Sequence, residues 1–161
     1  MEEQKYDISQ FTEFKSGDRV KKDVFRGKHF NIVVISLDSG YEIPPHDEPY
    51  DVFFYVVSGS GVFTAGKQQW DAKPGSMIFA PAGVRGIHFN IVVICLDSGY
   101  EISPHDEPYD VFFYVVSGSG VFTAGKQQWE AKPGSMIFAP AGIRGIKCAE
   151  RLTILGIQEP H

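Results

Sequence analysis

The sequence is short of cysteine, of clustered basic residues and of long apolar runs, and each shortage excludes a class of protein. Its two cysteines, Cys95 and Cys148, share no motif. We interpret each as a buried thiol in a reducing compartment rather than as half of a disulfide or part of a metal site. The formal net charge is −5, and no Lys/Arg cluster forms a stripe that could neutralise phosphates, which argues against a nucleic-acid partner. The longest apolar run, Val52–Val57, has six residues, against the ~20 that a membrane-spanning helix needs.

The first five residues, Met1–Lys5, are mostly acidic and polar, without the basic and then apolar pattern of a secretory signal. We therefore expect a cytoplasmic protein with no membrane partner. A hydrophobic content of 43%, with 14% aromatic residues, indicates a globular chain rather than a disordered one.

Helical patterns are also missing, because no long stretch has apolar residues at helical spacing after a capping residue. Short runs rich in Val, Ile, Phe and Tyr are separated instead by turn clusters every ~8–12 residues, which is typical of a β-sandwich or barrel. The predicted strands are Asn31–Leu37, Val52–Ser58, Gly61–Ala65 and Ser76–Ala80, their counterparts from Asn90 onward, and Val20–Arg26 and Arg151–Ile157.

The chain repeats itself. Residues 29–87 and 88–146 align without a gap at an offset of 59, and only four positions differ. The differing pairs are Ser36/Cys95, Pro44/Ser103, Asp71/Glu130 and Val84/Ile143. An Arg-Gly dipeptide recurs at 59-residue intervals, and removing one copy would leave 102 residues, an ordinary single-domain length. We interpret the repeat as a segmental duplication, natural or constructed, inside a parent of ~100 residues.

Within each copy, glycines and prolines have the spacing of two known motifs. The first copy has Gly40, His46, Glu48 and Gly59, then Gly75, Pro81 and Gly83; the second has Gly99, His105, Glu107 and Gly118, then Gly134, Pro140 and Gly142. This pattern resembles the two conserved motifs of the cupin superfamily. The resemblance implies an all-β, cupin-type jelly-roll barrel (a double-stranded β-helix) with a tandemly duplicated core.

In metal-binding cupins, three His and one Glu hold the ion, and this sequence departs from that set. Only His46 is retained; Glu48 replaces a His, Val52 replaces the Glu and Gly86 replaces the last His. The second copy has the same replacements. Since imidazole and carboxylate both ligate first-row metals, the resemblance leaves an incomplete site for a divalent metal. The candidate metal ligands are His46, Glu48, His105 and Glu107.

Strand alternation predicts that Phe54, Met77 and Phe79 lie on one interior face with His46. An eight-stranded barrel can just hold one small ligand. The candidate pocket residues are therefore His46, Glu48, Phe54, Met77, Phe79, His105, Glu107, Phe113, Met136 and Phe138. The alternatives are a solvated loop around His46 and a packed core. Phe53 and Tyr55 point the other way, and without N-terminal strands to cover them they would form a subunit contact.

The duplication gives two cores but one N-terminal segment (1–28) and one C-terminal tail (147–161), around repeats 29–87 and 88–146. Three arrangements fit: two barrels sharing the strand His88–Leu96, one barrel with the other copy poorly packed, or exchange of copies between chains. We predict two cupin-like halves, with domain swapping as the alternative. Self-association, as a homodimer or a swapped oligomer, is the partner expected in either case.

The function predicted from these residues is the binding of a small molecule in an apolar barrel pocket. One alternative is a metal-dependent cupin enzyme of the dioxygenase or isomerase type with a degenerate metal site. The other is a non-catalytic structural assembly module whose barrel is simply filled. The sequence does not specify a substrate.

Overall fold

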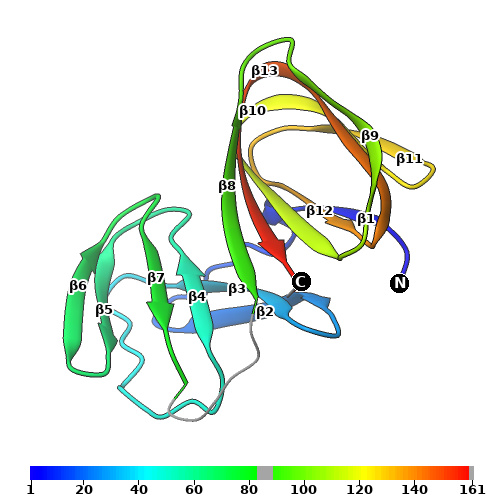
Figure 1. Ribbon diagram of the computed structural model, residues 1–161. Coiled ribbons are helices and arrows are strands. Elements are labelled where there is room, and N and C mark those ends of the chain that lie inside the picture. Colours follow the sequence, from blue (N-terminus) through cyan, green and yellow to red (C-terminus); the bar gives the residue numbers. More distant parts are fainter. Residues whose placement is uncertain (83–88, 160–161) are drawn as a thin grey trace. The chain divides into compact units, whose positions relative to one another are not determined.

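The computed structural model describes residues 1–82 and 89–159, and its regular secondary structure is almost entirely β-strand (Figure 1). The chain forms two compact units. Unit 1 comprises Met1–Tyr41 and Phe89–His161, and unit 2 comprises Glu42–His88. The tandem all-β fold is confirmed. Within the described residues, no helix has the length and apolar character needed to cross a membrane.

Unit 1 contains a seven-stranded antiparallel sheet in the order β1-β12-β10-β13-β8, with β11 paired to β10 and β9 paired to β13. Its strands are β1 (Gln4–Asp7), β8 (Asn90–Leu96), β9 (Glu101–Glu107), β10 (Val111–Ala124), β11 (Gln127–Ala131), β12 (Ser135–Ala139) and β13 (Gly142–Gln158). The sheet curls into a barrel wall (Figure 1). All the repeat-derived strands of this sheet belong to the second copy.

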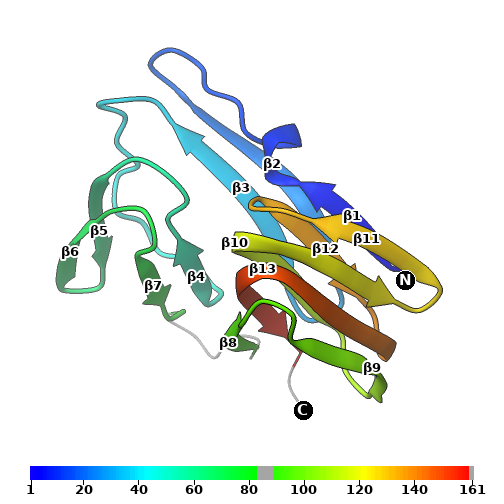
Figure 2. The same cartoon turned by 90° about the horizontal axis from the view of Figure 1, so that it is seen from above.

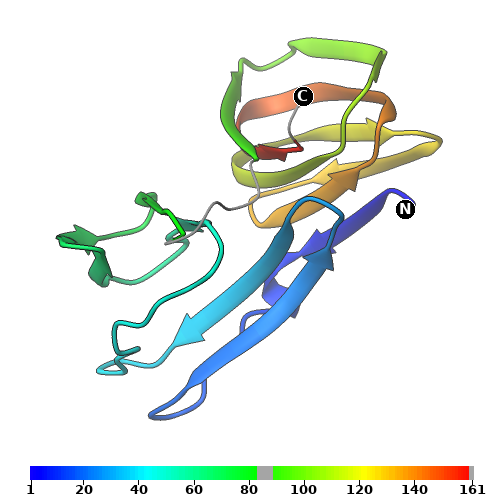
Figure 3. The same cartoon turned by 60° about the horizontal axis from the view of Figure 1, so that its bottom comes forward.

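A second element of unit 1 is the hairpin of β2 (Arg19–Arg26) and β3 (Asn31–Leu37), which follows the short 3-10 turn Ile8–Gln10. Figures 2 and 3 show β2 and β3 side by side as a long antiparallel ribbon. The predicted strand Asn31–Leu37 matches β3, and Val20–Arg26 lies within β2.

Unit 1 has two layers of core. One cluster fills the barrel interior: Val111, Phe113, Val115, Phe122, Ala124, Ala131, Ile137, Ala139, Ile146, Cys148, Leu152 and Ile154. The other lies on the opposite face of the wall, where Phe112, Met136 and Phe138 pack against Val24 and Phe25 of β2. The ring of Phe25 is 4.3 Å from that of Phe138 and 5.7 Å from that of Phe112, so the hairpin closes this outer face with aromatic contacts.

Unit 2 holds the remainder of the first copy in two separate pairs of strands. β4 (Val52–Tyr55) pairs with β7 (Met77–Ala80), and β5 (Gly61–Ala65) pairs with β6 (Gln68–Ala72). Among its described residues, only Ala72 and Ile78 are buried hydrophobic residues. The predicted strand Gly61–Ala65 matches β5.

The turn clusters predicted between the strands include the Ser-Gly-Ser-Gly segments at residues 58–61 and 117–120, and for the second copy this prediction is wrong. Residues 117–120 lie inside β10, which continues through them with register shifts against β13. A Cβ at Gly118 would lie 1.8 Å from the Arg151 carbonyl oxygen, and its φ is +85°, so the close pairing requires glycine here. The pairing strand β13 runs into the C-terminal tail, which occurs once in the chain.

Unit 1 combines parts of all four of the predicted segments 1–28, 29–87, 88–146 and 147–161. Strand β3 of the first copy pairs with β2 in unit 1, and β8 pairs with β13 in the same unit. The residues around the central junction, including Gly83, Gly86 and His88, lie outside the described residues. The segment boundaries and the shared strand His88–Leu96 therefore stay predictions.

Candidate functional site

The His-Asp-Glu segment of the second copy forms an ion pair at the end of β9. The Nδ1 atom of His105 lies 2.8 Å from the carbonyl oxygen of Ser103, and its Nε2 atom lies 2.8 Å from Oε1 of Glu107. The His105 side chain is 47% exposed, so it is accessible to solvent. In the ladder with β13, His105 lies opposite Arg144 and Glu107 lies opposite Gly142.

These contacts raise the pKa of His105 above its ordinary value. The largest cause is the hydrogen bond to the Ser103 carbonyl, followed by the hydrogen bond to the Glu107 carboxylate. Both acceptors favour the imidazolium, which donates from both ring nitrogens. The positive charge of Arg144 opposes them more weakly. The pair therefore favours the protonated imidazolium over the neutral ring.

The first copy forms the same pair without a strand to hold it. His46 Nδ1 lies 2.9 Å from the Pro44 carbonyl oxygen, and Nε2 lies 2.7 Å from Glu48 Oε1, in an irregular segment before β4. The Pro44/Ser103 difference has no effect on this contact because the acceptor is a backbone carbonyl. The pair is therefore a local consequence of the His-x-Glu spacing.

Sequence reasoning missed a group of residues that hold the loop after β9. Arg144 is buried, donates from Nη1 to the Tyr109 carbonyl oxygen at 2.7 Å and lies 4.6 Å from the centre of the Tyr109 ring. Asp110 Oδ1 accepts a hydrogen bond from the Ala141 backbone N–H at 2.8 Å. The signal for Arg144 was the recurring Arg-Gly dipeptide, which was interpreted only as a mark of duplication.

The donor set does not fit a cupin metal centre. Within residues 1–82 and 89–159, no group of three or more His, Cys, Asp or Glu side chains is arranged to hold a metal ion. Each copy offers one His and one Glu whose donor atoms already contact each other, whereas protein metal sites generally supply three ligands or more. The cysteines do not add to the site: Cys148 is buried as predicted, but Cys95 is exposed, so the prediction of a buried thiol there is wrong.

The predicted common face of the apolar pocket residues is also wrong. Register pairs Phe113 with Ile137 in the barrel interior, while Met136 and Phe138 lie on the outer face, where Phe138 pairs with Phe112. In the first copy, Phe54 packs edge-on against Phe63 with ring centres 5.4 Å apart. Met77 and Phe79 lie on the opposite face of their pair of strands and are exposed. The prediction misaligned the two strands by one residue, and a shift of one residue moves every side chain of a strand to the opposite face.

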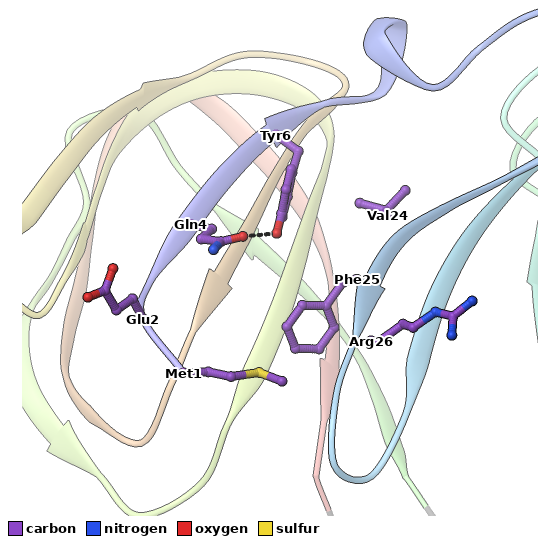
Figure 4. A pocket seen from close by; sticks show the side chains of 7 residues that line it. All are labelled: Met1, Glu2, Gln4, Tyr6, Val24, Phe25 and Arg26. Atoms are coloured by element: carbon purple, nitrogen blue, oxygen red, sulfur yellow. Dashed lines mark hydrogen bonds between the residues drawn. The ribbon is translucent and has the colours of Figure 1, made fainter.

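Two hollows in unit 1 are lined by residues outside the predicted pocket. One, of about 340 Å³, is lined by Met1, Glu2, Gln4, Tyr6, Val24, Phe25 and Arg26, where Tyr6 donates a hydrogen bond to Gln4 (Figure 4). The other, of about 280 Å³, is lined by Cys95, Leu96, Asp97, Arg151, Leu152 and Thr153. Neither contains a predicted pocket residue or a group of metal ligands.

The comparisons with known proteins agree with this barrel. The cupin domain family matches residues 33–90 and 92–144, so the chain belongs to the cupin family. No curated protein sequence matches it.

Among solved structures, the chain is similar to a cupin 2 conserved barrel domain protein from Leptotrichia buccalis, with 14% identity, a TM-score of 0.82, and coverage of 98% of this chain and 96% of that one. This likeness concerns the fold. Smaller overlaps involve salicylate 1,2-dioxygenase from Pseudaminobacter salicylatoxidans (15% identity, 44% and 21% coverage, TM-score 0.43). A conserved protein of unknown function from Streptococcus pyogenes gives 24% identity, 50% and 71% coverage, and a TM-score of 0.43.

Proposed function

We propose that this cupin is a structural assembly module whose barrel is filled by its own side chains. The supporting observation is the interior cluster of unit 1. Phe122 is 1% exposed and packs edge-on against Phe113, with ring centres 5.5 Å apart, while Ile137 and Ile154 are fully covered. An apolar ligand inside this barrel would have to displace side chains that are already packed against one another.

A filled interior predicts how the protein responds to small apolar probes. Wild-type protein should show no saturable binding of benzene, whereas Phe122→Ala should open a dry cavity that binds it. The same substitution should lower the free energy of unfolding by about 3–5 kcal/mol. Phe63→Ala, at the equivalent position of the first copy, is the matched control and should leave unit 1 unchanged. Saturable benzene binding by the wild type would overturn the proposal.

A second candidate function is the binding of a small polar molecule at His105 and Glu107. It is supported by the exposure of this pair and by its recurrence at His46 and Glu48. A ligand with both a donor and an acceptor, such as a small hydroxy acid, would suit the two partners. Titrating a hydroxy-acid series while following the His105 ring protons by NMR tests this. Shifts that saturate, and that vanish in His105→Ala, would support it; unchanged resonances would exclude it.

A further inference from the structure

The same set of side chains is mostly buried in the second copy and partly exposed in the first. We name the set Phe53, Tyr55, Met77 and Phe79 the copy-1 outer face; the strands β4 and β7 place these side chains in register. Its counterpart in the second copy is Phe112, Tyr114, Met136 and Phe138, on β10 and β12. Met136 is 2% exposed, whereas Met77 is 51% exposed. The residue types are the same, so the difference lies in what covers them.

The cover of the second-copy face comes from the N-terminal part of the chain. The residues packed there include Tyr6, Ile8, Phe11, Val24, Phe25, Ile32 and Val34. They are all apolar, and several are aromatic, so this face is completed by an apolar and aromatic surface. Residues 1–28, which supply all of these side chains except Ile32 and Val34, occur once in the chain, so each chain has two such faces but one N-terminal cover.

We propose that the copy-1 outer face is a self-association surface, on which the same face of a second copy of this chain packs. If two chains exchanged their N-terminal segments, each segment would still cover only one face. One face in each chain would therefore remain exposed. Packing two copy-1 outer faces together covers both, in the isologous manner of a two-fold dimer. The face carries no charged side chain, so the two copies meet without like-charge repulsion.

The exposed apolar surface of the copy-1 outer face is centred on two side chains. Met77 and Phe79 are each 51% exposed, whereas Phe53 and Tyr55 beside them are half-buried. An isologous contact would therefore place Met77 and Phe79 against the same residues of the second chain. Since a stable interface covers about 800 Å² per partner, a polar rim would supply most of that area.

This inference rests on the proposed structural function, and sedimentation equilibrium of the full chain tests it. The wild type should have twice the chain mass of 17.9 kDa. Introducing Met77→Asp with Phe79→Asp should reduce the mass to that of one chain, because a buried charge opposes the contact. Val93→Asp is the matched control: Val93 is 52% exposed but lies on β8 in unit 1, so this variant should remain a dimer.

If the two aspartate substitutions unfold unit 2, disulfide crosslinking between chains still tests the proposed contact. In a Cys95→Ser background, Phe79→Cys should form a disulfide between chains on mild oxidation, and Val93→Cys should not. A wild-type monomer, or a dimer whose mass is unchanged by Met77→Asp with Phe79→Asp and which fails to crosslink through position 79, would overturn the inference. Benzene binding tests the filled barrel separately, so the two proposals fail independently.

Discussion

Phe79 and Phe138 occupy the same position of the repeat, yet Phe138 is 1% exposed and lies against the ring of Phe25, whereas Phe79 is 51% exposed. Both sit on antiparallel strands opposite an equivalent phenylalanine, Phe53 or Phe112. Local sequence therefore does not decide burial at this position. The segments that occur once in the chain decide it, because they complete the barrel around the second copy.

The first prediction concerns the stability of unit 1. Phe138→Ala should lower the free energy of unfolding of unit 1 by about 3–5 kcal/mol, because it removes a buried ring and leaves a cavity. Phe79→Ala removes the same atoms from an exposed site and should change it by less than about 0.5 kcal/mol. Denaturant titration measures both changes.

The two tryptophans make this comparison specific, since Trp129 lies in unit 1 and Trp70 in unit 2. With Trp70→Phe as the background, fluorescence follows unit 1 alone. An equal loss of unit 1 stability from Phe79→Ala and Phe138→Ala would contradict the account, because Phe79 lies in unit 2.

The second prediction concerns the titration of His105. Glu107→Gln should lower the pKa of His105, because it replaces a carboxylate acceptor with a neutral amide. The remaining hydrogen bond to the Ser103 carbonyl should keep the pKa above its ordinary value. An NMR titration of the imidazole protons measures both values. A pKa unchanged by Glu107→Gln would contradict the ion pair.

The raised pKa of His105 also determines how the stability contributed by the His105–Glu107 pair changes with pH. Because folding raises the pKa of His105, the stabilisation is complete at pH below the ordinary histidine value and is lost as pH rises through the raised value. His105 is exposed, so solvent screens the contact and the effect on unfolding should be small. Comparing the pH dependence of the free energy of unfolding between the wild type and His105→Gln measures this contribution of His105.

The third prediction concerns the loop held by Asp110. Asp110→Ala removes the acceptor of the Ala141 N–H and should lower the free energy of unfolding of unit 1 by about 1 kcal/mol. Asp51 makes the equivalent contact, accepting from the Ala82 N–H at 2.6 Å. Asp51→Ala should therefore leave unit 1 unchanged when Trp129 is the probe. An equal effect of the two substitutions on Trp129 unfolding would contradict the separate roles.

The fourth prediction concerns metal. Protein purified without chelator, and then equilibrated with Zn²⁺ or Fe²⁺ and gel-filtered, should retain less than one equivalent, because no third ligand joins His105 and Glu107 among the residues that the structure describes. Elemental analysis measures the ratio. The double variant His46→Ala with His105→Ala should retain the same amount. Stoichiometric metal that this double variant loses would contradict the account and favour the metal-enzyme alternative.

The strands were predictable because their β-branched and aromatic runs end at glycine and serine clusters; β3 and β5 begin and end at the predicted residues. The His-Glu pairs were equally local, since they need only the His-x-Glu spacing. The faces were not predictable from one strand at a time. Whether Met136 shares a face with Phe113 depends on register between β10 and β12, and a displacement of one residue reverses the answer.

The conformation of the Ser-Gly-Ser-Gly segment could not be predicted from the sequence for a similar reason. It follows β4 and leads into β5 in the first copy and lies within β10 in the second, where β13 pairs with it. The exposure of Cys95 likewise follows from its place on β8 and not from its residue type.

Hydrogen exchange at equivalent peptides of the two copies tests the asymmetry between them most directly. Peptides 68–80 and 127–139 are identical except for Asp71 and Glu130, so one methylene group separates their masses while their intrinsic exchange rates are nearly equal. At low protein concentration, peptide 127–139 should exchange far more slowly, because β12 is paired on both sides, with β1 and β10. Equal exchange of the two peptides would contradict the account, since it would mean that both copies form equally packed barrels.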